Sequence, residues 1–382
     1  MRHEALIVGK DSQYLINAKH IEAIYASKNV LHKLFLIFTE CKVIIKHNNH
    51  ISLCMQIFLT FDYELFFGEN SGTAQNCLIK PTNKLLAIAR KTKCLYTFFV
   101  DVGYLLKLES YKLSHPNLAK DLNLIKAQLH QIIEEGHDVQ LHIHPHWEKS
   151  YYDRNGWHMN THNYYRLHNF SDQEIDEIVG KYKNYLEEII HRSVHTFRAG
   201  GWCIQPFECL INVFKKHGIH YDSSVMYNTK MESGNYFFNY IKAPDKDIYS
   251  FENDIVIEDK NGLFTEIPIS SRKYNPWFYW KLYILGRLHP SNHKMIGDGS
   301  FMAQPGRKKE VLTKSTWSHV SCDGYYASVL DKAKIELNQK GKKNMVVIGH
   351  PKGMTSFSYV KLYNFIRASS TKDTFTTFNL LK

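Results

Sequence analysis

The sequence predicts an α/β protein built on a parallel sheet. Short apolar runs alternate with longer segments of helical period along most of the chain, which is the order that βαβ units have. Each run ends abruptly in polar residues, as buried parallel strands do at the edge of their sheet. In parallel α/β barrels the active site is built from the loops at this carboxyl edge, so the one-sided placement also predicts a site.

The individual elements follow from these runs and from signals at their ends. Pro81 stands at a helix start, Ser171 with Glu174 forms a capping box, and Gly136 follows a helix end. The dipeptide Asn261-Gly262 suits a type I′ turn and predicts a hairpin over 255–270. The predicted strands are residues 55–61, 95–100, 138–141, 194–197, 219–221 and 345–348. The predicted helices are residues 81–93, 117–135, 171–190, 206–217, 276–288, 324–339 and 355–369, and residues 104–116 are predicted to be a polar connection.

Three parts of different character divide the chain. Residues 1–50 show no clear period, and we interpret them as an N-terminal appendage. Residues 51–370 carry the regular organisation of the predicted barrel, with an insertion at about 225–344 where the alternation of strands and helices loosens. Residues 371–382 are expected to form a C-terminal tail.

Composition and charge limit the classes of partner. The chain has 382 residues, of which 44% are hydrophobic and 22% charged, enough for one large barrel or two ordinary domains. Its formal net charge is +11, but the basic residues are scattered along the sequence, so nucleic acid is not an expected partner. A peripheral membrane association or a lipid-linked glycan is compatible with the positive charge.

Cysteine usage and the N-terminal region predict a cytoplasmic location. Seven cysteines form no CxxC pair and are odd in number, which is typical of free thiols in a reducing compartment. The most apolar N-terminal run, 30–38, contains His32 and Lys33 and is too short to span a bilayer. Because no small-residue cleavage site follows it, we expect neither a signal peptide nor a membrane anchor.

Three histidines follow the third predicted strand within five residues. Neutral imidazole is the commonest protein ligand for zinc and similar metals. His142 and His146 can converge on one ion if the chain turns between them, and Pro145 marks such a turn. A single histidine on an apolar run is more often a hydrogen-bonded core residue, but three so close together favour a metal site.

Two carboxylates follow the first predicted strand. Strand alternation directs Asp62 and Glu64 to one side of the sheet. One carboxylate and two imidazoles are the three-ligand set of a catalytic zinc site that leaves a fourth position open. We choose Glu64 as the metal ligand and leave Asp62 to take a proton from a water that the metal activates. Asp62 as a helix cap or turn residue is the plainer alternative.

Polar residues after the later strands complete the candidate catalytic set. Arg198 could orient a carboxylate and keep it ionised. His350 could protonate a leaving nitrogen, and Asp222 could hold that histidine in the required tautomer. An ordinary ion pair for Arg198, a cap for Asp222 and a structural role for His350 are the alternatives, and their joint position after strands of one sheet argues against them.

Five motifs, in this order, resemble those of the polysaccharide deacetylase family, also called the NodB homology domain or carbohydrate esterase family 4. They are Leu59-Thr60-Phe61-Asp62-Tyr63-Glu64, residues 136–146, Phe197-Arg198-Ala199-Gly200-Gly201, Tyr221-Asp222-Ser223-Ser224 and Val347-Ile348-Gly349-His350. The resemblance spans roughly residues 51–370. It implies a distorted (β/α) barrel of about seven parallel strands, a divalent metal that is usually zinc, and hydrolysis of N-acetyl groups on a carbohydrate.

The resemblance also implies a role for individual residues. Asp62 resembles the catalytic base of the family, and Arg198 resembles the residue that orients this base. His142 and His146 resemble the two histidine ligands, and His350 resembles the catalytic acid.

The motifs depart from the family pattern at three places. Tyr63 stands where the family often has a second aspartate, so the acidic ligand moves to Glu64. Gly200-Gly201-Trp202 replaces a proline and an aromatic residue in the third motif. His144 matches no family role and is interpreted as a supporting residue or an alternative ligand.

The function expected from these motifs is a metal-dependent removal of N-acetyl groups from a polysaccharide, a cell-surface glycan or a lipid-linked sugar. One alternative is a hydrolase of a non-sugar C–N bond, such as that of a cyclic ureide, on the same scaffold. Another is a carbohydrate-binding relative without catalysis, which Tyr63 and the altered third motif would suit. An amidohydrolase barrel fits less well, because its paired histidines belong on the first strand.

Overall fold

The computed structural model describes residues 5–9, 12–16, 54–234 and 236–381, in two compact units that divide between residues 52 and 53. The first unit contains an antiparallel pair, β1 (Ala5–Gly9) and β2 (Ser12–Ile16). The rest of the predicted appendage lies outside the described residues. The second unit carries every candidate site residue.

One curled sheet forms the centre of the second unit, and all but one of its strands run parallel. Its strand order is β12-β13-β9-β8-β5-β4-β3-β16, and β17 pairs with β3 beside this path. The strands are β3 (Gln56–Tyr63), β4 (Thr97–Asp101), β5 (Asp138–Ile143), β8 (Thr196–Ala199), β9 (Tyr221–Asp222), β12 (Tyr249–Phe251), β13 (Phe264–Glu266), β16 (Asn344–Gly349) and β17 (Thr374–Thr376). Only β12 is antiparallel to its neighbour. Part of the predicted C-terminal tail is thus a strand of the sheet.

Backbone hydrogen bonds of the residues after β13 connect the β9 side of the sheet to the β16 side. The amide of Ile269 donates to the carbonyl of Val225 at 2.9 Å, and the amide of Ser270 donates to Val346 of β16 at 3.0 Å. The carbonyl of Ser270 also accepts from Val320, which lies beside β16. The sheet is therefore a distorted (β/α) barrel, as predicted.

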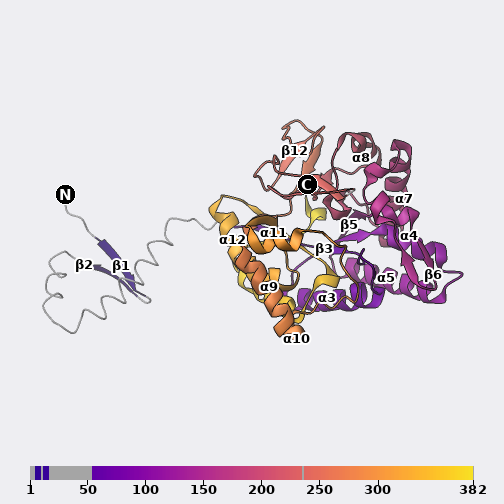
Figure 1. The fold of residues 1–382 in the computed structure, drawn as a ribbon. Coiled ribbons are helices and arrows are strands. Elements are labelled where there is room, and N and C mark those ends of the chain that lie inside the picture. Colours follow the sequence, from indigo (N-terminus) through magenta and orange to yellow (C-terminus); the bar gives the residue numbers. More distant parts are fainter. Residues whose placement is uncertain (1–4, 10–11, 17–53, 235, 382) are drawn as a thin grey trace. The chain divides into compact units, whose positions relative to one another are not determined.

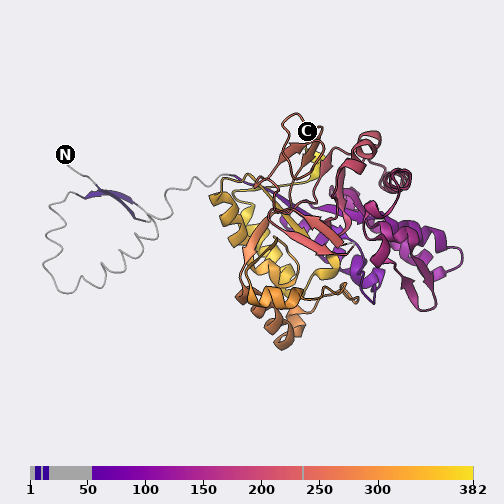
Figure 2. The same ribbon diagram turned by 45° about the horizontal axis from the view of Figure 1, so that its top comes forward.

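Helices surround this sheet (Figures 1 and 2), and their apolar residues are buried in the same core as those of the strands. On α5, Leu122, Ile125, Leu129 and Ile132 recur at helical spacing and are all buried. The predicted capping box of α7 is present, with the Ser171 hydroxyl and the Glu174 carboxylate bonded to each other's backbone amides. These helices are α3 (Lys80–Thr92), α4 (Val102–Tyr111), α5 (Pro116–Glu134), α7 (Asp172–Ile190), α8 (Ile211–His217), α12 (Leu330–Gln339) and α13 (Ser356–Ser369).

The structure corrects two local predictions. Residues 104–116, predicted to be a polar connection, contain most of α4, because Leu105 and Leu108 are buried one turn apart. The hairpin predicted around Asn261-Gly262 is also wrong, since the paired strands are β12 and β13 and a longer loop joins them. Gly262 is needed there for close approach, because a Cβ at that position would lie 2.3 Å from the Phe251 carbonyl.

The long segment between β9 and β16 adds short elements outside the sheet. They are β10 (Lys230–Ser233), β11 (Tyr236–Asn239), β14 (Ser271–Tyr274), α9 (Pro276–Leu288), α10 (Pro290–His293), α11 (Arg307–Thr313) and β15 (Thr316–His319). β10 pairs with β11 and β14 with β15, both antiparallel. The chain between β5 and α7 also forms β6 (Tyr151–Asp153), β7 (Gly156–His158) and α6 (Thr161–Tyr164).

Candidate active site

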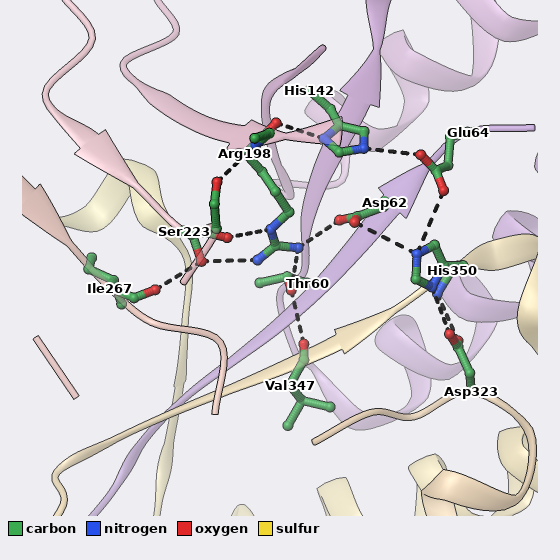
Figure 3. A network of polar contacts seen from close by, with 12 residues as sticks. Thr60, Asp62, Glu64, His142, Arg198, Ser223, Ile267, Asp323, Val347 and His350 are labelled. Carbon is green, nitrogen blue, oxygen red and sulfur yellow. Dashed lines mark hydrogen bonds and ion pairs between the residues drawn. The ribbon is translucent and has the colours of Figure 1, made fainter. Parts of the chain in front are cut away.

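Five of the seven predicted site residues come from four parallel strands and lie together at the carboxyl ends of these strands. Asp62 and Glu64 lie at the end of β3, His142 is in β5, Arg198 is in β8, and His350 follows β16 (Figure 3). Parallel strands end at the same edge of a sheet, so residues far apart in sequence reach one place.

A carboxylate and two imidazoles form a cluster that could hold a metal ion. One carboxylate oxygen of Glu64, Oε2, lies 3.0 Å from Nε2 of His142 and 2.6 Å from Nε2 of His144. One ligand atom from each of these residues lies within 4.8 Å of the others, and all three side chains are buried. Two imidazole nitrogens and a carboxylate oxygen are the usual three-ligand set of catalytic zinc.

The protonation of these histidines decides whether a proton or a cation lies between them and Glu64. Nδ1 of His142 lies 2.8 Å from the carbonyl oxygen of Arg198, which can only accept, so Nδ1 carries a proton. Although burial lowers the pKa of His142, the charges of Asp62 and Glu64 outweigh this effect and raise it, so either a proton on Nε2 or a cation would lie between this ring and Glu64. Burial lowers the pKa of His144 to about 4, which keeps its ring neutral and able to bind a metal.

His146, predicted as the second histidine ligand, lies beside this cluster, and the third member of the cluster is His144. Alternation along β5 points His142 and His144 to the same side, whereas Pro145 starts a tight turn at residues 145–149. The His146 ring packs against Phe67, with 4.8 Å between the ring centroids. Both of its ring nitrogens are buried without a hydrogen-bond partner among the described residues. The role of His146 as a metal ligand stays a prediction.

Arg198 holds Asp62 in the interior of the barrel. Its Nη1 donates to Oδ1 of Asp62 at 2.6 Å and to the Thr60 hydroxyl at 3.0 Å, while Nε and Nη2 donate to the carbonyl and hydroxyl of Ser223. The guanidinium also lies over the Phe99 ring, 4.0 Å from its centroid. A buried charge is costly unless it is paired and hydrogen-bonded, and both conditions are met here. The structure thus places Arg198 where it can orient this carboxylate.

The partner of His350 is Asp323, not Asp222 as predicted. Nδ1 of His350 lies 2.7 Å from Oδ2 of Asp323, whose Oδ1 accepts from the His350 backbone amide at 2.7 Å. Although burial lowers the pKa of His350, the charges of Asp323, Asp62 and Glu64 outweigh this effect and raise it. Asp323 reaches this position because Ser321 forms a parallel bridge with Ile348 of β16, a pairing with no signal in the local sequence.

Asp222 lies instead in a buried pair with Glu266 on the neighbouring strand. The two residues are in register between β9 and β13, and a proton on one of the two carboxyl groups would relieve the repulsion between two buried charges. Burial raises the pKa of both groups, and the charge of Asp222 raises that of Glu266 further. Asp222 also accepts from the amide and hydroxyl of Ser224, at 2.8 and 2.9 Å. Its role in the structure is to hold the turn after β9.

Lys352 is a site residue that the motif analysis missed. Its Nζ lies 2.8 Å from Oε1 of Glu64 and donates to the Leu65 carbonyl, and the side chain is buried against the rings of Phe66 and Phe67. Burial opposes ionisation of Glu64, but Lys352 and His144 hold the pKa of this carboxyl well below its usual range. Lys352 therefore fixes one oxygen of Glu64 and leaves the other facing the imidazoles. The signal that the sequence offered was a lysine shortly after β16.

The departures from the family motifs leave the site intact. Tyr63 points into the core, where its hydroxyl donates to Oε1 of Gln128 at 2.8 Å. Gly200 allows the third motif to approach the cluster, because a Cβ there would lie 2.6 Å from Nδ1 of His144. The second aspartate of the family pattern is thus replaced by a residue that faces away from the cluster.

The cluster predicts that metal binding depends more on His144 than on His146. Loss of a residue that hydrogen-bonds a metal ligand weakens metal binding about 10- to 100-fold. We expect His144→Gln to weaken zinc binding by more than this, because one of the three candidate ligands is removed. His146→Gln is the matched variant in the same segment and should have a smaller effect. Isothermal titration of metal-free protein with zinc measures both. Equal affinities for His144→Gln and the wild type would contradict the cluster.

The Asp222–Glu266 pair predicts a specific dependence of stability on pH. A carboxyl group whose pKa is raised on folding makes its full contribution to stability below its unfolded pKa of about 4, where the group is protonated. This contribution is lost as the pH rises through the pKa of the group in the folded protein. Glu266→Gln supplies a neutral donor at every pH. The variant should therefore gain thermal stability relative to the wild type between about pH 5 and about pH 8.

Melting temperatures by calorimetry at both pH values measure this effect. The exposed Glu208 provides the control, and Glu208→Gln should melt in parallel with the wild type. A constant difference between Glu266→Gln and the wild type across this range would show that the pair shares no proton.

No protein-family model and no curated protein matches this sequence. Several solved structures are similar to it. Puue allantoinase is 12% identical over 86% of this chain and 89% of its own, with a TM-score of 0.46. A protein named as a polysaccharide deacetylase from Mycobacterium smegmatis is 14% identical over 85% of this chain and 87% of its own, with a TM-score of 0.44. The catalytic domain of a peptidoglycan N-acetylglucosamine deacetylase from Eubacterium rectale is 12% identical over 86% and 91%, with a TM-score of 0.38. With identities and TM-scores this low, the function of the chain has to be argued from the contacts of its own site.

Proposed function

We propose that this protein is a metal-dependent hydrolase that removes N-acetyl groups from a carbohydrate. One observation carries the proposal: Nε2 of His350 lies 3.7 Å from Oδ2 of Asp62 and 3.7 Å from Oε1 of Glu64. A candidate acid, a candidate base and a candidate metal ligand therefore face one small volume. The order and content of the five sequence motifs support an N-acetylated sugar as the substrate.

Glu64, His142 and His144 would hold the metal. Zinc is the ion that two imidazoles and one carboxylate favour, although manganese, iron and cobalt are also compatible with these donors. When bound, such an ion polarises the carbonyl of the substrate and lowers the pKa of a nearby water. Lys352 supports this arrangement by keeping Glu64 ionised.

Asp62 is the general base of the proposed reaction. Arg198 occupies Oδ1 of Asp62, and Oδ2 is the oxygen that faces His350 and is free to accept a proton from the attacking water. As the oxygen of this water bonds to the amide carbon, its proton moves to Asp62. The contacts of Arg198 with Thr60 and Ser223 fix the direction in which the base points.

His350 is the general acid of the same reaction. Its Nδ1–H is held by Asp323, so a proton on Nε2 points toward the reacting groups. The raised pKa of His350 favours the protonated ring that an acid requires. Breaking the C–N bond transfers this proton to the departing nitrogen and yields acetate and an amine.

We expect Asp62→Asn to lower kcat for acetate release by about 10²- to 10⁴-fold, because the amide cannot accept the proton of water. His350→Gln should have an effect of similar size. The measurement is acetate release from a panel of N-acetylated mono- and oligosaccharides by zinc-loaded protein. Zinc titration shows whether each variant still binds metal. A variant that binds zinc as the wild type does has lost activity because of the removed catalytic group.

Asp222→Asn is the control for this experiment, because Asp222 bonds Ser224 and not His350. It should retain most of the acetate release. Activity of Asp62→Asn equal to that of the wild type would overturn the assignment of the base. A metal-loaded wild type that releases no acetate from the panel, yet hydrolyses cyclic ureides, would favour the non-sugar alternative.

A further inference from the structure

Helix α9 presents an apolar face to solvent. Trp277, Trp280, Ile284 and Leu288 are 44% to 67% exposed. They follow one another at intervals of three or four residues, which places them in one stripe along the helix. Large apolar side chains that gather in this way usually mark a site of contact with another molecule or a membrane.

The opposite face of α9 packs into the apolar interior of this region. Tyr279 is buried with Tyr274 and Val311 in a small apolar cluster, and Phe278 and Tyr283 pack against it. Trp280 is held from the side, since its Nε1 donates to the carbonyl of Leu312 at 3.2 Å. The exposed stripe is therefore presented by a helix that is anchored through its other face.

Basic residues surround this stripe. Lys281 and Arg287 flank it on α9, and Nζ of Lys308 on α11 lies over the Tyr283 ring, 5.2 Å from its centroid. The exposed basic residues of this surface are Lys281, Arg287, Lys294, Lys308, Lys309 and Lys314. Within residues 271–316 the acidic residues are Asp298, which is bonded to Thr73 and Asn76, and Glu310, which is paired with Arg307. The exposed charges that this segment contributes are therefore predominantly positive.

We propose that the surface formed by α9 and α11 docks this protein on an anionic phospholipid bilayer. Tryptophans and aliphatic side chains on a helix enter the boundary between headgroups and acyl chains, while lysines and arginines contact the anionic headgroups. A helix of 13 residues is too short to cross a bilayer, so α9 lies in the plane of the interface. In the described part of the chain, no helix combines the length and apolarity that crossing a membrane requires.

The docking surface connects to the candidate site through the segment between α10 and α11. In this segment the amide of Gly297 donates to the carbonyl of Lys352 at 3.1 Å, and Phe301 contacts Phe66, with 4.9 Å between the ring centroids. These contacts link the docking surface to Lys352, whose side chain pairs with Glu64. Docking itself is independent of the reaction that the site performs.

Flotation of the full-length protein with vesicles tests the proposal. Vesicles of phosphatidylcholine with phosphatidylglycerol should carry the wild type, and pure phosphatidylcholine should carry little. Trp277→Ser combined with Ile284→Ser and Leu288→Ser should lower binding at least about tenfold, because each removes apolar area from the interface. Lys308→Gln and Lys309→Gln should each lower it about fivefold, and raised salt should weaken it further.

Matched variants on other exposed surfaces control for general effects. Leu113→Ser with Ile335→Ser removes exposed apolar groups elsewhere, and Lys91→Gln with Lys260→Gln removes the same charge. These variants should float as the wild type does, and equal melting temperatures exclude misfolding of the α9 variants.

Three outcomes would overturn the proposal. The first is a wild type that does not float with anionic vesicles. The second is a triple α9 variant that floats as the wild type does. The third is a wild type that sediments as a dimer without binding vesicles and becomes monomeric in the triple variant, which would assign the face to a second copy of the chain.

Discussion

The site depends on the neutralisation of two buried carboxylates that stand two residues apart. Asp62 and Glu64 lie at the end of a strand that is covered on both faces, where an uncompensated charge costs several kcal/mol. Each has a cation of its own, Arg198 for Asp62 and Lys352 for Glu64. These pairs leave Oδ2 of Asp62 and Oε2 of Glu64 free of the cations. The free oxygens are the atoms that the proposed chemistry uses.

Much of this arrangement could be predicted from the sequence, because it follows from strand polarity. Apolar runs that end in polar residues located β3, β5, β8 and β16 to within a few positions, and the one-sided placement of Asp62, His142, Arg198 and His350 predicted a shared edge. What could not be predicted is how each loop turns after its strand. The four-residue spacing of His142 and His146 suggested convergence, whereas the turn that begins at Pro145 directs His146 toward Phe67.

The missed residues have a common physical reason. Asp323 and Lys352 acquire their roles through contacts that no local pattern encodes, one through a bridge to β16 and the other through a side chain that extends back to β3. The helix over residues 276–288 was predicted from its aromatic sequence, but the sequence does not distinguish a helix buried on all sides from one with an open apolar face. That distinction depends on what packs against the helix, and here α11 covers one flank only.

The end of β8 and the loop that follows it connect the proposed base to the proposed metal ligands. The guanidinium of Arg198 holds Asp62, and its carbonyl oxygen accepts from Nδ1 of His142. Two residues later, Gly200 approaches His144 so closely that a single added carbon would displace the ring. One short segment therefore fixes the direction of the base, the tautomer of one imidazole and the position of the other. Because these constraints share one backbone, a shift of this segment would change the proposed metal binding and the proposed proton transfer together. Gly200 allows the segment to hold Asp62, His142 and His144 at the same time, because it has no side chain to displace the His144 ring.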